Sequence, residues 1–260
     1  MFGLLIKLGK KVEYGLRFTG QIFFFTIEAF TLIVKGKIRW RDTIRQIYEI
    51  GVEAFPIISI ASLATGMVMA VQAAVILARF GARQYIANFV GLALVRELSP
   101  VLGSIIFVGK SGAKISAEIG SMSVNEQLLA TRTLGIDPMY FFTTSRLLAC
   151  MIALPILVCW SGIIGILGGL VISAIQENIP MQSYLDYTFR SLRVVDFAGG
   201  MIKTCFFSVI IGIVCCFKGF QTRGGSTGVG RYTTEAVALS TILIIISNFI
   251  LTKLILTVWG

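Results

Sequence analysis

A series of long apolar stretches constrains this chain more than any other feature. Residues 55–78 and 147–175 contain no charged side chain. A helix crosses the hydrocarbon core of a bilayer with about 20 apolar residues, so each stretch is long enough to cross alone. Residues 236–252 are likewise uncharged, and two weaker stretches at residues 85–109 and 199–217 complete a set of five predicted spans. A mean hydropathy of +0.86 with 14% charged residues agrees with an all-α integral membrane protein.

The first 50 residues are predicted to form an N-terminal region separate from a five-helix domain at residues 51–260. On a helix, residues 1–17 place leucines on one side and mostly lysines on the other, which favours a basic amphipathic helix in the membrane interface. A partner-binding helix is the alternative. Residues 18–34 are nearly long enough to cross, but basic clusters flank both ends. The positive-inside rule therefore predicts a re-entrant or interfacial elbow and a cytoplasmic N-terminus.

The basic residues indicate a lipid surface and not a nucleic acid. The net charge is +10, and the cations flank apolar spans without forming a soluble basic module. Attraction to anionic lipid at the cytoplasmic leaflet explains them. The chain has no histidine, and its five cysteines lie in apolar segments without a CxxC pair. We therefore predict neither a metal site nor a catalytic residue.

Two glycine-rich stretches resemble nucleotide-binding motifs without matching them. Residues 103–111 have five residues between the glycines where a P-loop has four, and they end a membrane span. Residues 224–230 lack the G-x-G-x-x-G spacing and follow a span, not a strand. We expect no cofactor on this chain, so ATP and its Mg²⁺ would be bound by a partner.

A short helix is predicted between the second and third spans, at about residues 124–134. Ser123 and Glu126 have the spacing of a capping box, and Gly135 with Pro138 supplies a C-terminal stop. The helix is too short to cross the membrane. It is either an ordinary connection or a rigid element that receives motion from a cytoplasmic motor.

A resemblance favours the second interpretation. The segment from Leu94 to Pro138 contains RELSP, GKSGAKISAEIG, M-x-x-x-EQ and LGIDP, and residues 224–237 contain a spaced Gly, Gly-Val-Gly and Thr-Thr pattern. From about residue 40 onward the chain is similar to permeases of the MlaE family, the membrane subunits of ABC transporters that work with MCE-domain proteins. The family pattern is broken at two positions. An acidic residue is expected near Asn248, and arginine is common at the position of Lys110.

The resemblance implies a homodimeric, multi-pass permease of the bacterial inner membrane, with the plastid envelope as the alternative. Its implied partners are a cytoplasmic ABC ATPase, an MCE-domain protein on the opposite side, phospholipid and a small accessory subunit of the STAS type. The implied substrate-cavity residues are Arg96, Glu97 and Lys203. The residues implied to couple to the ATPase are Glu118, Gly120, Glu126, Gln127 and Gly135.

The charges of RELSP have a physical interpretation. Charged side chains inside a membrane usually face a cavity or each other. Arg96 and Glu97 are adjacent, so on a regular helix they point about 100° apart and do not neutralise one another. Pro100 removes a backbone donor and favours a kink. We hypothesise that Arg96 holds a lipid phosphate while Glu97 pairs with Lys203; the alternative is that both side chains extend to an aqueous boundary.

Two other function classes remain open at this point. An ion-coupled secondary transporter of an amphipathic substrate needs no ATPase, but the sequence shows neither inverted repeats nor a carboxylate-rich midplane. An intramembrane enzyme needs a convergent catalytic set, and the sequence contains none. A nucleotide-binding partner distinguishes both from an ABC permease.

Overall fold

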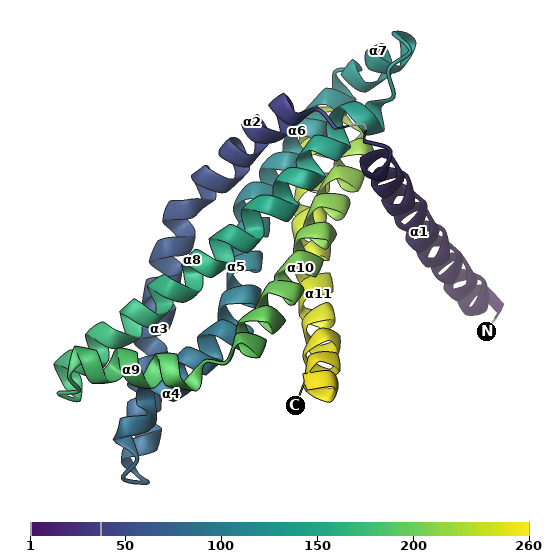
Figure 1. Ribbon diagram of the computed structural model, residues 1–260. Helices are drawn as coiled ribbons and strands as arrows, with labels where there is room; N and C mark the ends of the chain where they lie inside the picture. The colour runs from purple at the N-terminus through teal and green to yellow at the C-terminus, as the bar shows by residue number, and fades with distance from the viewer. Residues whose placement is uncertain (1, 37, 260) are drawn as a thin grey trace.

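The computed structural model describes residues 2–36 and 38–259 and contains helices but no β-strand among them (Figure 1). This confirms the predicted all-α class. The α-helices are α1 Phe2–Val34, α2 Trp40–Gly51, α3 Phe55–Ala78, α4 Ile86–Ala93, α5 Ser99–Phe107, α6 Ala113–Val124, α7 Gln127–Thr133, α8 Thr144–Gln176, α9 Met181–Ser191, α10 Val194–Phe220 and α11 Gly225–Trp259. Short 3₁₀ or π turns join several of them: η1 Val52–Ala54, η2 Arg83–Tyr85, η3 Leu94–Leu98, η4 Val108–Gly112 and η5 Met139–Thr143.

All five predicted spans are helical and long enough to cross a membrane. The first coincides with α3, and the third and fourth lie within α8 and α10. The last is longer than predicted, because α11 begins at Gly225 in a polar stretch that hydropathy alone excludes. Pro155 lies inside α8 without ending it.

The second span is interrupted by two π turns. In η3 the N–H of Ser99 donates to the carbonyl of Leu94, five residues earlier, and Pro100, which follows, has no N–H to donate. The helix is therefore widened at the level of Arg96 and Glu97, next to the proline where the sequence predicted a kink. A second π turn, η4, contains Gly109, Lys110 and Gly112.

The N-terminal region differs from the prediction. One continuous helix, α1, covers both the expected amphipathic helix and the expected elbow. Its residues 15–34 are long and apolar enough to count as a sixth candidate span. The predicted amphipathic pattern falls mainly on the side chains of residues 1–12 and 14, which lie outside the described ones. Whether this helix crosses or lies in the interface stays a prediction.

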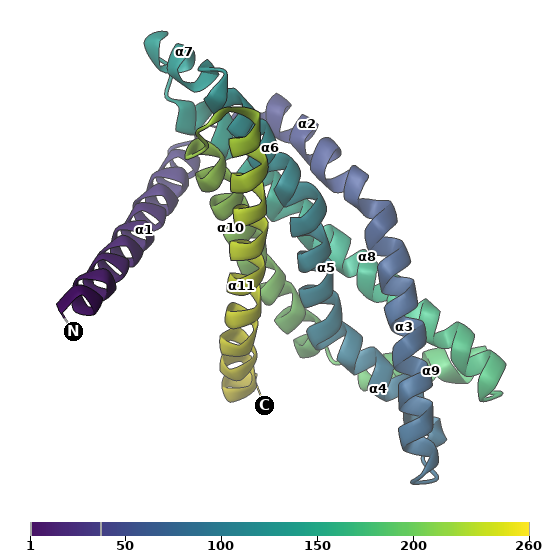
Figure 2. The same ribbon diagram turned by 180° about the vertical axis from the view of Figure 1, so that it is seen from behind.

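Helix α1 is joined to the rest of the chain near its middle and its C-terminal end. The rings of Phe18 and Phe25 pack edge-on against Phe217 of α10, and Phe25 also contacts Phe220. The N-terminal end of α1 stands apart from the other helices in both views (Figure 1, Figure 2). Helix α1 therefore adds Ala29 and Leu32 to a side cluster of buried residues, while the central core comes from the later helices.

The two ends of the molecule differ in what they carry. Both views place α7 at one end together with α2 and α6, and α9 at the opposite end (Figure 1, Figure 2). Between them, α3 packs along α8, and α10 packs against α6, α8 and α11. Buried side chains from several helices, including Ile58, Phe107 and Phe207, form the central core.

Candidate functional site

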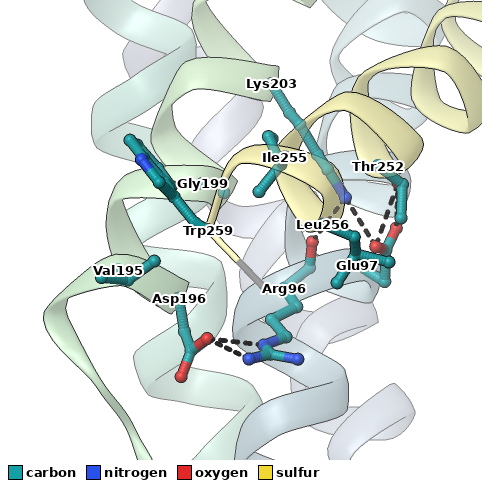
Figure 3. Close-up of a pocket in the computed structure, with 11 residues that line it drawn as sticks. Arg96, Glu97, Val195, Asp196, Gly199, Lys203, Thr252, Ile255, Leu256 and Trp259 are labelled. Atoms are coloured by element: carbon teal, nitrogen blue, oxygen red, sulfur yellow. Dashed lines mark hydrogen bonds and ion pairs between the residues drawn. The ribbon is translucent and has the colours of Figure 1, made fainter.

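A cavity of about 220 Å³ lies between η3, α10 and α11 (Figure 3). Its polar lining comes from Arg96, Glu97, Asp196, Lys203 and Thr252, and the rest is Val195, Gly199, Gly200, Ile255, Leu256 and Trp259. The cavity therefore combines charged side chains with apolar walls inside membrane-spanning segments. That combination suits an amphipathic ligand.

Arg96 is paired with an acidic residue that the sequence reasoning missed. Its Nε donates to Oδ1 of Asp196 at 2.6 Å, and its Nη2 contacts the same oxygen. Asp196 lies in the first turn of α10, where a carboxylate is favoured by the helix dipole, and its Oδ2 accepts from the N–H of Arg193 at 3.0 Å. The Asp196 side chain is buried, whereas 48% of the Arg96 side chain is exposed.

Glu97 and Lys203 form the ion pair that the sequence suggested. Lys203 Nζ donates to Oε1 of Glu97 at 2.6 Å and to the backbone carbonyl of Arg96 at 3.0 Å. That carbonyl is the one a regular helix would pair with residue 100, and proline leaves it open for Lys203. The Lys203 side chain is only 3% exposed, so the pair is buried on its cationic side.

A glycine allows α10 to approach η3 closely enough for this pairing. A Cβ on Gly200 would lie 2.6 Å from the carbonyl oxygen of Val95. Any side chain there would push α10 away from η3, and Lys203 is one helical turn further along the same helix.

Two residues of α11 also donate hydrogen bonds to Glu97. Asn248 Nδ2 donates to Oε2 at 3.1 Å, and the Thr252 hydroxyl donates to Oε1 at 3.1 Å. Because Asn248 is neutral, it offers Lys203 no charge partner, and Glu97 takes that place. Arg96 and Glu97 thus diverge as predicted, one toward Asp196 and the other toward Lys203 and Thr252 (Figure 3).

The structure therefore brings all three predicted cavity residues together. It adds Asp196, Thr252 and Asn248, which the sequence reasoning left out of the site. Asp196 carried a usable signal, an acidic residue at the start of an apolar span. Thr252 carried none, because a threonine in an apolar helix is common and its contact with Glu97 depends on how α11 packs.

A second cavity, of about 200 Å³, also borders the contact between Gly200 and Val95 of η3. Its lining is almost wholly apolar and includes Pro100, Val158, Ile163, Phe197 and Met201. The charged cavity thus has an apolar neighbour that shares Gly200 with it.

The predicted capping box of the short helix is wrong. Glu126 has a left-handed backbone, with φ of 59°, and makes no capping hydrogen bond. The Ser123 hydroxyl instead donates to the carbonyl of Thr222 at 3.2 Å. Helix α7 consequently begins at Gln127 and not at residue 124, because α6 continues to Val124.

The C-terminal stop of α7 is confirmed. Gly135 has φ of 75°, and its N–H donates to the carbonyl of Arg132. The N–H of Ile136 donates to the carbonyl of Thr131, which completes a Schellman motif. The helix ends one residue before the predicted position, at Thr133.

Two of the other predicted coupling residues, Glu118 and Gly120, lie on α6 and not on α7. Glu118 accepts from Arg146 Nη2 at 3.0 Å, where the Arg146 side chain is buried. Gly120 packs against Thr222, since a Cβ there would lie 2.8 Å from the Thr222 hydroxyl. Glu126 and Gln127 start α7. A hollow of about 580 Å³ separates α7 from the start of α11.

A multi-pass, all-helical membrane protein with a charged cavity and a short helix at one end has the architecture of a transporter membrane subunit. The sequence model of the permease MlaE family matches residues 43–254, and the chain belongs to this family. It is an ABC transporter permease subunit and not the ATPase.

Relatives cover nearly the whole chain. A probable ABC transporter permease protein of Rickettsia typhi is 36% identical over 96% of this chain and 97% of its own length. The intermembrane phospholipid transport system permease protein MlaE of Haemophilus influenzae is 31% identical over 95% of each. Protein TRIGALACTOSYLDIACYLGLYCEROL 1, chloroplastic, of Arabidopsis thaliana is 36% identical over 85% of this chain and 63% of its own length.

Proposed function

We propose that this chain is the permease of an ATP-driven transporter that moves phospholipids between an inner membrane and an outer envelope. The observation that carries the proposal is the charged cavity with apolar walls, formed by Arg96, Glu97 and Lys203 in membrane-spanning segments. The name of the Haemophilus influenzae relative, an intermembrane phospholipid transport permease, supports it. A bacterial inner membrane is the location we propose, with a plastid envelope as the alternative that the chloroplastic relative suggests.

In this proposal Arg96 holds the phosphate of the lipid. The guanidinium uses Nε and Nη2 for Asp196, and Nη1 has no hydrogen-bond partner among the described residues. A charged donor inside a spanning segment attracts an anionic group strongly, because little water screens it. The apolar walls, including Ile255 and Leu256, and the neighbouring apolar cavity give the acyl chains a compatible surface.

Replacing Arg96 by alanine is expected to lower phospholipid retention by about tenfold, since a charge-assisted hydrogen bond contributes roughly 1.5 kcal/mol or more. The measurement is quantitative mass spectrometry of the lipid that stays with the purified full chain. Arg190→Ala is the matched control, because Arg190 is exposed on α9 outside the cavity. Arg96→Lys keeps a positive charge beside Asp196. It shows whether a loss of lipid in Arg96→Ala comes from the missing charge or from misfolding. Unchanged lipid in a folded Arg96→Ala protein contradicts the role.

The ATPase is proposed to dock at the end that carries α7. Leu129, Leu134 and Ile136 are 58%, 77% and 38% exposed there. No residue of α7 itself is buried. Exposed apolar residues on an ordered element mark interaction sites. The Schellman stop and the contact of Ser123 with Thr222 hold this element in place. A homodimer, an MCE-domain protein on the opposite side and a small STAS-type subunit complete the proposed assembly.

The docking role of α7 predicts a specific loss. Leu129→Asp places a charge in the centre of the proposed contact and is expected to remove the ATPase from the purified complex, while Leu129→Met, which keeps volume and apolarity, is expected to retain it. Co-purification followed by an ATPase assay measures both. Full recovery of an active ATPase with Leu129→Asp would contradict the docking role of α7. A wild-type chain that purified without any ATPase would favour the ion-coupled alternative.

A further inference from the structure

The charged cavity exposes two opposite charges to its ligand, and the counterion of each is buried. Arg96 and Glu97 have 48% and 39% of their side-chain surface exposed, while Asp196 and Lys203 are each 3% exposed. Each exposed charge is therefore backed by a buried charge of the opposite sign. A ligand in the cavity meets a cation and an anion that are neighbours in the sequence.

The formal charges of the cavity add up to zero. Arg96 and Lys203 are balanced by Glu97 and Asp196, and Asn248, which donates to Glu97, is neutral. An anionic ligand would leave a net negative charge in a spanning segment, where charge is costly. A ligand that itself carries one positive and one negative group leaves no net charge.

Both exposed residues keep charged surface that a ligand is able to meet. Arg96 Nη1 is available as a donor beside the edge that holds Asp196. Glu97 accepts from Lys203, Asn248 and Thr252, and a carboxylate has about four acceptor sites. Thr252 also contacts Oε2 at 3.4 Å, so Glu97 offers a ligand its exposed negative charge, while Arg96 offers the N–H groups of Nη1. The two residues are adjacent and diverge from each other (Figure 3).

From this arrangement we infer that the cavity selects a zwitterionic phospholipid headgroup, with the phosphate on Arg96 and the ammonium group on Glu97. The inference rests on the proposed function and adds the substrate class to it. Asp196 is then a specificity-determining residue, because its charge cancels that of Arg96 and disfavours headgroups that carry only negative charge.

The test uses full-length chain extracted in mild detergent from a membrane that contains both phosphatidylethanolamine and phosphatidylglycerol. Bound and bulk lipids are quantified by mass spectrometry. Wild type is expected to be enriched in phosphatidylethanolamine relative to the membrane. Asp196→Asn raises the net charge by one and is expected to shift the ratio toward phosphatidylglycerol by about tenfold, equivalent to about 1.4 kcal/mol.

Two further variants keep the test decisive. Asp186→Asn makes the same change at an exposed position of α9 outside the cavity and is expected to leave the ratio unchanged. Asparagine at position 196 still accepts from the Arg193 N–H, but if that variant fails to fold, Asn248→Asp lowers the net charge by one and is expected to deplete phosphatidylglycerol further.

Each outcome has a distinct meaning. Bound lipid in the bulk ratio, unmoved by Asp196→Asn or Asn248→Asp, overturns the headgroup inference and leaves the proposed function standing. Wild-type chain that retains no phospholipid overturns the proposed function itself. Enrichment of phosphatidylethanolamine that reverses in Asp196→Asn supports both.

Discussion

Replacing Glu97 by alanine is expected to destabilise the folded chain by about 3 to 5 kcal/mol, the typical cost of breaking a buried ion pair by removing one partner. The reason is the burial of Lys203, whose side chain is 3% exposed and whose ammonium group would keep only the carbonyl of Arg96. Lys203→Met is expected to cost less, because Glu97 is 39% exposed and retains Asn248 and Thr252 as donors.

The double variant separates this explanation from a simple loss of packing. In Glu97→Ala combined with Lys203→Met neither charge of this pair is left without its partner, so stability is expected to recover most of what Glu97→Ala loses. Thermal unfolding of the purified full chain in detergent measures all three variants. Glu13→Ala is the control, since the Glu13–Arg17 pair is exposed and such pairs contribute little. Equal losses for Glu13→Ala and Glu97→Ala would rule out the buried-pair explanation.

The charged residues of the cavity were predictable because ionisable side chains in apolar spans are rare and usually functional. Arg96, Glu97 and Lys203 are visible in the sequence for that reason. Asp196 was not connected to them, because its contact with Arg96 joins residues that are distant in the chain. That contact depends on a close approach of α10 to η3 at Gly200, and helix packing of this kind has no local sequence signal.

At the short helix α7, a tertiary contact replaces the capping box that the local sequence predicts. Ser123 and Glu126 have the spacing of a capping box, but the Ser123 hydroxyl bonds to the carbonyl of Thr222 across the interface with the end of α10. The stop at Gly135 was predicted correctly, because a left-handed backbone needs only the glycine itself. The first feature competes with a distant partner, whereas the second does not.

The N-terminal helix shows the limit of charge patterning. Basic clusters on both sides of residues 18–34 led us to separate an elbow from an amphipathic helix. Helix formation between them has no breaker, since residues 15–20 contain no proline and their glycines are tolerated within a helix. Charge rules concern the side of the membrane, and they do not determine where a helix is interrupted.

Replacing Gly66 by alanine is expected to disrupt the packing of α3 on α8 and to cost more than the 1 to 3 kcal/mol that is common for overpacking. A Cβ on Gly66 would lie 1.8 Å from the backbone carbonyl oxygen of Gly165, which has no rotamer with which to give way. The GxxxG pattern of Gly165 and Gly169 thus serves contacts within one chain, with Gly169 making room for the buried hydroxyl of Tyr184.

The order of three glycine variants tests this account. Gly165→Ala meets the end of the Leu94 side chain at 3.1 Å, which is able to move, so its loss in stability is expected to be smaller than that of Gly66→Ala. Gly20→Ala meets no atom within 4 Å and lies in a helix, where alanine is favoured over glycine by about 1 kcal/mol. The unfolding temperature is therefore expected to be lowest for Gly66→Ala, intermediate for Gly165→Ala and highest for Gly20→Ala. If Gly66→Ala unfolds at the wild-type temperature, α3 and α8 do not pack through this glycine. The position of α8, which supplies part of the lining of the apolar cavity, then needs another explanation.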